Sequence, residues 1–314
     1  MWLNVYRVML FVAIWVPVVY AADGENRKFV FDYRVSIGEV SGHAKLWIPV
    51  PQDTAHQDIA GLNVETNTEY TYVTDSDYGN RFVLVEREGG GIDIAINFTV
   101  TRERRTAGDV GNSVTLSSEE RARYLGASRL VVIDGVVHKE AHRIAGGAKT
   151  TYAKARSLYD HIVDTVRYDK SGKGWGRGDA VYACHTRAGN CTDFHSLFIG
   201  EARSLGVPSR FLMGFSVPND KPSGTISGYH CWAEFYKDGT GWLPLDASEA
   251  FKNQRRRDEL FGGLDANRVQ ITVGRDITLP GMAGEPLNFA IYPYVEVEGK
   301  VSDAATYSFE YRSR

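Results

Sequence analysis

Three residues in predicted elements, Cys191, His230 and Asp246, have the side-chain types that nucleophilic catalysis requires. Cys191 follows Gly189 and Asn190 and opens a predicted helix, where unpaired N–H groups and the helix dipole lower the pKa of a thiol. His230 lies in a predicted strand and could act as the base, and Asp246 ends the next strand and could orient the imidazole. Neighbouring antiparallel strands would bring His230 and Asp246 within hydrogen-bonding reach. The pattern predicts a thiol nucleophile, its base and an orienting carboxylate.

The residues around Cys191 also have structural interpretations. A Cys at a helix start can be a packed thiol, and a strand His followed by Trp can be a core residue. For Asp193 we expect helix capping or a buried structural hydrogen bond, and for His195, one turn after Cys191, we expect support of the cleft rather than catalysis. Trp175 and Asn190 could line the cleft or contribute to an oxyanion hole.

The Cys and His residues near these motifs do not match a common structural zinc pattern. The sequence contains no paired C-x2-C, and no EF-hand loop that would indicate calcium. We therefore predict neither a metal nor a cofactor. The residues considered as metal ligands are Cys184, His185, Cys191, His195, His230 and Cys231.

The order of the three motif blocks resembles the core of the transglutaminase-like superfamily. The resemblance covers residues 148–248 well and the flanks weakly. It implies a papain-like site with Cys191 as nucleophile, His230 as general base and acid, and Asp246 as orienter. An exported chain with an N-terminal β domain resembles the bacterial branch of that family. The blocks are G-N-C-T-D-F-H-S-L-F at 189–198, Y-H-C-W-A-E-F at 229–235 and G-W-L-P-L-D at 241–246, with Tyr168-Asp169 and 205–210 as further matches.

Two regions of different character must position these residues. Residues 22–108 alternate in hydrophobicity with period two between turn signals, which predicts an antiparallel β-sandwich-like domain. Residues 109–314 begin with helices, including 148–169 and one from 191 to about 205, and continue with strands that we expect to complete one sheet. The predicted fold class is α+β. The Gly-rich segment 171–180 lacks the spacing of a phosphate loop and is predicted to be a mobile surface loop.

The N-terminal segment predicts export. Residues 1–21 combine Arg7 with an apolar run at 8–20, typical of a signal peptide cleaved before Ala22; the competing interpretation is an uncleaved membrane anchor. We therefore expect a periplasmic or secreted protein. Its formal net charge is −3 and its basic clusters are short, so a nucleic-acid partner is not expected.

The three cysteines leave the redox state open. Strand alternation predicts that Cys231 points away from His230 and therefore does not bond Cys191. Cys184 lies seven residues before Cys191 and allows three outcomes. These are no permanent disulfide, a Cys184–Cys231 bond, or a reversible Cys184–Cys191 lock.

We expect a thiol acyl-transfer enzyme that acts on a protein or peptide. Cys191 would attack a Gln side-chain or peptide carbonyl and form a thioester, which an amine acceptor (crosslinking) or water (deamidation or proteolysis) would resolve. The alternative is a non-catalytic, exported binding or scaffolding module that retains the fold. The presence of Cys191, His230 and Asp246 together counts against this alternative, because a scaffold does not need all three.

Overall fold

The computed structural model describes residues 26–108 and 115–314. The predicted signal peptide, residues 1–21, and its cleavage site lie outside the described residues. Within 26–108 and 115–314, no helix combines the length and the apolar character needed to span a membrane. The described elements confirm the α+β fold class, with mostly antiparallel strands.

The first sheet has eight strands and is built on two long ones. β1 (Asn26–Val50) and β4 (Arg81–Glu103) pair along nearly their whole length, with register shifts near Val40. β1 forms because apolar residues recur at every second position, and Phe29, Phe31, Tyr33, Val35 and Ile37 are all buried. The other members are β2 (Gln57–Thr66) and β3 (Thr71–Thr74) beside β4, and β8 (Ser223–Thr225), β12 (Tyr294–Val297), β13 (Lys300–Val301) and β14 (Ala305–Ser313).

The C-terminal strands join this first sheet, which corrects our expectation that they complete the sheet of the second region. β14 pairs antiparallel with β1 from Phe29↔Ser313 to Ile37↔Ala305, and β12 pairs with the other half of β1. The second sheet is therefore only four-stranded. Its order is β10 (Gly241–Leu245), β9 (His230–Lys237), β7 (Ser209–Ser216) and β11 (Arg268–Val273).

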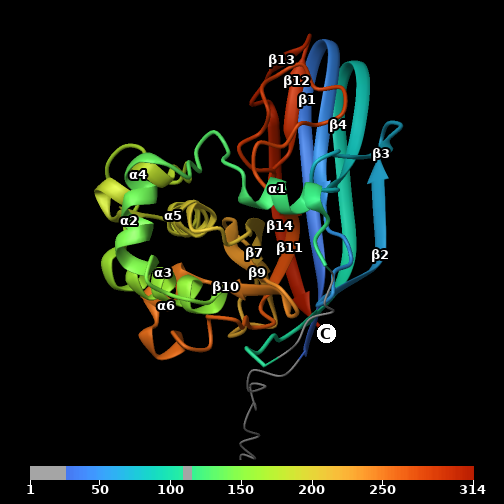
Figure 1. Cartoon of the computed structure of the whole chain (residues 1–314). Coiled ribbons are helices and arrows are strands. Elements are labelled where there is room, and N and C mark those ends of the chain that lie inside the picture. The colour runs from blue at the N-terminus through green and yellow to red at the C-terminus, as the bar shows by residue number, and fades with distance from the viewer. Residues whose placement is uncertain (1–25, 109–114) are drawn as a thin grey trace, which may run out of the picture.

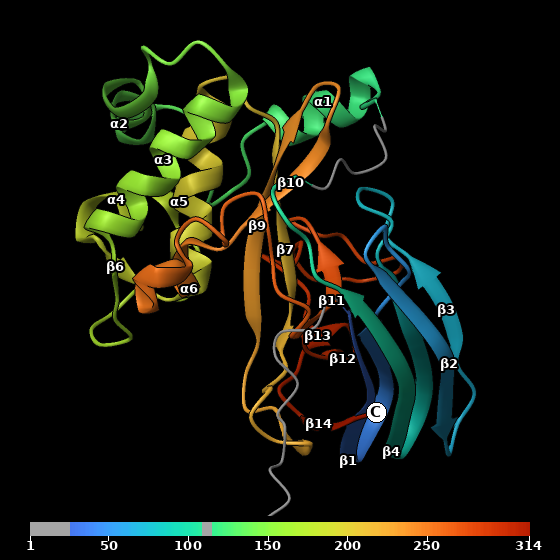
Figure 2. The same ribbon diagram turned by 90° about the horizontal axis from the view of Figure 1, so that it is seen from below.

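Helices cover the outer face of the four-stranded sheet, and the eight-stranded sheet lies on its other side (Figures 1 and 2). The helix predicted within 148–169 is α3 (Thr151–Thr165), and one face of it is buried through Ala155, Leu158, Tyr159, Ile162 and Val163. The helices are α1 (Ser118–Leu125), α2 (Gly135–Ala145), α3 (Thr151–Thr165), α4 (Ala180–Thr186), α5 (Cys191–Ser204) and α6 (Ala247–Lys252), with a 3-10 turn η1 (Gln254–Arg256) and a short parallel pair, β5 (Arg167–Tyr168) and β6 (Ala188–Gly189).

The two sheets are joined by aromatic packing. The ring of Phe31 on β1 lies 5.6 Å from that of Phe215 on β7, and Phe309 on β14 lies 4.4 Å from Phe215. Burying large aromatic rings against one another is a major source of packing energy. The eight-stranded sheet therefore packs on one face of β7 and β9, while α5 packs on the opposite face (Figure 2).

Candidate active site

Helix α5 begins at Cys191 because the side chains of Asn190 and Asp193 cap its N-terminus. The Asn190 side chain accepts from the Thr192 N–H, and the Asp193 carboxylate accepts from the Asn190 N–H at 2.9 Å. The two residues form a capping box, which satisfies N–H groups that the helix cannot. The capping role expected for Asp193 is confirmed. A glycine is required at position 189, just before the cap residue Asn190, since any Cβ there would overlap the Asp193 carboxylate.

The Gly-rich segment is a surface loop, as predicted, and the Asp193 carboxylate also binds its second half. The Asp193 carboxylate accepts from the N–H of Gly176 at 2.7 Å and of Gly178 at 3.0 Å. Trp175 lies in this segment beside Lys170, whose ammonium is 6.0 Å from the indole ring. A buried carboxylate thus ties the loop to the start of α5.

The structure brings Cys191, His230 and Asp246 together as a chain of contacts. His230 lies beside the Cys191 thiol, and each group shifts the pKa of the other, while His230 Nε2 lies 2.6 Å from Asp246 Oδ2. Because Nε2 is engaged by the carboxylate, Nδ1 is the ring nitrogen left for the thiol. Cys191 is 2% exposed, His230 5% and Asp246 0%. A thiol, an imidazole and a carboxylate therefore share a nearly water-free site.

The charges of these groups reinforce one another. Burial alone would lower the pKa of His230, but the Asp246 carboxylate and the bond to Cys191 raise it to about 10. Burial would raise the pKa of Asp246, yet the charges of His230 and Arg268 hold it well below its usual range. The Cys191 pKa lies well below that of an ordinary thiol, first through a hydrogen bond from Cys231 and then, against the effect of burial, through His230. The favoured resting form is a thiolate–imidazolium pair.

Comparison with known proteins identifies this part of the fold. The profile of the transglutaminase-like superfamily matches residues 139–247, the segment that contains all three residues. Residues 139–247 belong to the transglutaminase-like superfamily. The resemblance noted in the sequence is thereby confirmed.

Individual relatives extend the comparison beyond the transglutaminase-like core. A Haemophilus influenzae protein described only as uncharacterized is 27% identical and covers 94% of this chain and 93% of its own. The uncharacterized protein YebA of Bacillus subtilis is 21% identical over 70% of this chain, which spans 31% of YebA. A crystal structure of a candidate cysteine protease from Cytophaga hutchinsonii matches 92% of this chain and 91% of its own, with a TM-score of 0.64 and 21% identity. That structure shares the fold.

Asp246 is anchored by residues that the sequence analysis did not single out. Arg268, at the start of β11, donates to Asp246 Oδ2 at 3.0 Å and to Asp265 at 3.0 Å, and is itself 2% exposed. The Ser248 hydroxyl donates to Asp246 Oδ1 at 2.9 Å, and the Glu249 N–H donates to the same oxygen at 3.0 Å. Asp246 thus caps α6 while it orients His230. No local signal marked Arg268, which lies 22 residues further along the chain.

The supporting position expected for His195 is borne out by its contacts. His195 Nε2 accepts from the Ala247 N–H at 3.1 Å and lies 3.6 Å from Asp246 Oδ1. Asn190 reaches across the site as well, since its Nδ2 donates to the Tyr229 hydroxyl at 3.0 Å, and that hydroxyl lies 2.9 Å from Thr192 Oγ1. His195 thus links α5 to the start of α6, and Asn190 links it to Tyr229, the residue before His230.

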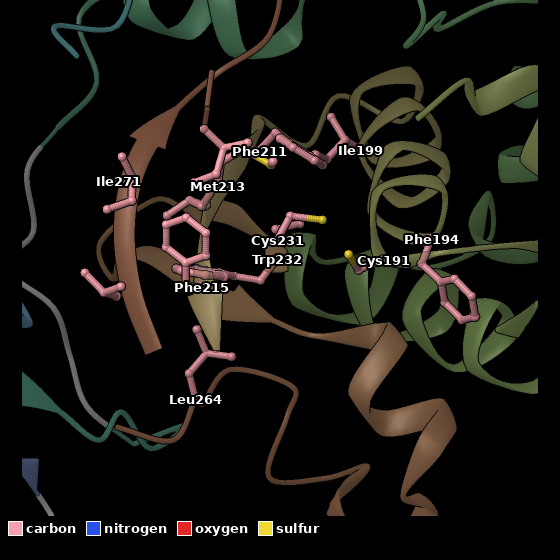
Figure 3. Close-up of a cluster of buried hydrophobic side chains, with 14 of the residues drawn as sticks. Cys191, Phe194, Ile199, Phe211, Met213, Phe215, Cys231, Trp232, Leu264 and Ile271 are labelled. Atoms are coloured by element: carbon pink, nitrogen blue, oxygen red, sulfur yellow. The ribbon is translucent and has the colours of Figure 1, made fainter. Parts of the chain in front are cut away.

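No disulfide joins Cys231 to Cys191, but the expectation that Cys231 would lie away from Cys191 was wrong. Figure 3 shows the sulfur atoms of Cys191 and Cys231 directed toward one another, from α5 and from β9. Alternation does hold along β9, because Cys231 faces α5 while the Trp232 ring lies 5.2 Å from the Arg268 guanidinium on the other side. The error lay in placing His230 and Cys191 on one sheet face. Each is the first residue of its element, so they meet where both elements begin.

The remaining cysteine lies elsewhere. The Cys184 thiol donates to Glu140 Oε2 at 2.9 Å, in a cluster with Arg187 and His161. All three cysteines fall within the described residues and are free there. Among residues 26–108 and 115–314, no group of three or more His, Cys, Asp or Glu side chains is placed to hold a metal ion.

Proposed function

We propose that this protein is a thiol acyl-transfer enzyme in which Cys191 is the nucleophile. The observation that carries the proposal is the position of His230, which bridges the Cys191 thiol and the Asp246 carboxylate inside a buried site. The opposite pKa shifts of Cys191 and His230 are those that activate a thiol at neutral pH.

The first half-reaction uses groups already in place. The Cys191 thiolate attacks a carbonyl carbon, and the backbone N–H groups at the start of α5 stabilise the oxyanion that forms. The His230 imidazolium then gives its proton to the departing nitrogen as the tetrahedral intermediate collapses to a thioester. Asp246 keeps Nδ1 of His230 directed at the reacting atoms throughout. The leaving group is ammonia from a Gln side chain or an amine from a peptide bond.

In the second half-reaction an amine or water attacks the thioester. Neutral His230 takes the proton of the incoming nucleophile, and Cys191 departs as the thiolate, which restores the starting state. With an amine the product is a crosslink; with water it is a deamidated side chain or a cleaved peptide. The low exposure of Cys191 and His230 favours a slender acyl donor such as a Gln side chain. The predicted N-terminal signal peptide supports action outside the cytosol.

An acyl-enzyme trapping experiment tests the proposal. The protein is incubated with Gln-containing peptides, quenched in acid and analysed by intact and peptide mass spectrometry. We expect an adduct on Cys191 with the mass of the donor less ammonia, absent from Cys191→Ala and present in Cys184→Ala. An adduct that carries only part of the peptide would assign peptide-bond cleavage instead. No adduct, together with an ordinary alkylation rate at Cys191, would reject the proposal in favour of a binding module.

A further inference from the structure

A second thiol faces the nucleophile. Cys231 on β9 is fully buried, and its sulfur points across the interface toward Cys191 at the first position of α5 (Figure 3). The same sulfur lies 3.7 Å from His195 Nδ1 and 3.9 Å from Thr192 Oγ1. Cys231 is therefore surrounded by hydrogen-bonding groups, unlike a thiol that merely fills space.

The contacts of His195 determine which way the Cys231 proton can point. His195 Nε2 accepts the Ala247 N–H, so it carries no proton. Burial lowers the pKa of His195 and keeps its ring neutral, which leaves the single ring proton on Nδ1. Nδ1–H then donates to the Cys231 sulfur. Since that face of the sulfur already receives a proton, the Cys231 S–H is free to point to Cys191 or Thr192.

Cys231 also remains a thiol when Cys191 is a thiolate. Burial raises the pKa of Cys231 well above its usual range, and the negative charges of Cys191 and Asp246 raise it further. The two thiols therefore carry one negative charge between them, and it is located on Cys191, beside His230. The other ionisable groups around the two thiols are His195, Asp193, Arg275 and the tyrosines 168, 229 and 292.

We propose that Cys231 is a positioning residue for the nucleophile: its S–H donates a hydrogen bond to the Cys191 thiolate, on the side that His230 does not occupy. The chain of donors is His195 Nδ1–H to Cys231 sulfur, and Cys231 S–H to Cys191 sulfur. This inference rests on the proposed thiolate chemistry of Cys191 and adds a second stabilising group to it. A hydrogen bond to a charged group is among the stronger ones in proteins.

The test measures the rate of Cys191 alkylation by iodoacetamide against pH, followed by mass spectrometry. Cys231→Ala and Cys231→Ser form a matched pair, because they differ only by a hydroxyl donor, and Cys184→Ala is the control distant from the site. For Cys231→Ala we expect the apparent pKa of Cys191 to rise by about one unit, which is about a tenfold loss of thiolate on the acid side of the profile. For Cys231→Ser we expect most of that loss to be restored, and for Cys184→Ala we expect an unchanged profile.

Equal profiles for the Ala and Ser variants, whether shifted or unshifted, would overturn the positioning role, because only the donor distinguishes them. A wild-type profile with an ordinary thiol pKa would instead reject the proposed function itself. A second measurement avoids substitution of Cys231. In a Cys184→Ala background, the Raman S–H stretching band of Cys231 should move to higher frequency when Cys191→Ala removes the acceptor. A band that stays in place would contradict the proposal.

Discussion

Replacement of Asp246 by Asn should weaken the electrostatic coupling between Cys191 and His230. The carboxylate is the largest influence that raises the pKa of His230 to about 10, against the effect of burial. Without it we expect that pKa to fall to about 6.5 or lower, the ordinary value for an imidazole. At pH 7.5 His230 would then be charged in at most about one molecule in ten. Because Cys191 loses its cationic partner, its alkylation at that pH should slow by about tenfold or more.

The same substitution should also destabilise the fold, so its effect on the alkylation of Cys191 must be separated from its effect on stability. Asp246 pairs with buried Arg268, and breaking such a pair typically costs about 3–5 kcal/mol. Asp265→Asn is a matched control, because Asp265 is the other carboxylate bound to Arg268 but does not contact His230. We expect both variants to lose stability in urea unfolding, and only Asp246→Asn to change the pH profile of alkylation. An unchanged profile in Asp246→Asn would refute the role assigned to the carboxylate.

Three further predictions follow from burial, steric fit and sequence. The carboxyl group of Glu201 is fully buried, has no hydrogen-bond partner among the described residues, and has a pKa raised well above 4.5 by burial. The proton on this carboxyl therefore stabilises the folded state below about pH 4.5, and that stabilisation is lost as the pH rises. Glu201→Gln should reduce the fall in unfolding free energy between about pH 5 and 8 in urea titrations. A Cβ at Gly189 would overlap Asp193. Gly189→Ala should therefore lower both the melting temperature and the rate of Cys191 alkylation. Gly147→Ala is the control, because the space around its Cβ is open, and it should leave both quantities unchanged. N-terminal sequencing of exported material should begin near Ala22, and a start at Met1 would instead favour the anchor.

Local patterns were sufficient to place Cys191, His230 and Asp246 near one another. The helix start at Cys191 is encoded by Asn190 and Asp193 within three positions, and the β9–β10 hairpin pairs Ala233 with Leu245, which brings the following Asp246 beside His230. Such features depend on residues near one another in the chain. They can be recognised without knowledge of the whole fold.

The features that the sequence analysis missed depend on contacts between distant segments. Arg268 contacts Asp246 only because β11 pairs with β7 in the sheet. Likewise, β14 pairs with β1 although the two strands lie at opposite ends of the described sequence. The placement of Cys231 failed for a related reason. Alternation fixes which sheet face a side chain occupies, but it does not say where the start of a helix crosses that sheet.

The return of β14 to β1 has a consequence for the order in which this protein can fold during synthesis. Arg27 and Ser313 share a 2.9 Å hydrogen bond although they are 286 positions apart, whereas β1 can pair with β4 as soon as residue 103 is made. One edge of β1 must therefore stay unpaired until the whole of the transglutaminase-like core, residues 139–247, has been made. Open strand edges invite pairing with other chains, and contacts of such long separation form slowly. We therefore expect the nascent chain to be most prone to aggregation after the core is complete and before Phe309 docks between Phe31 and Phe215.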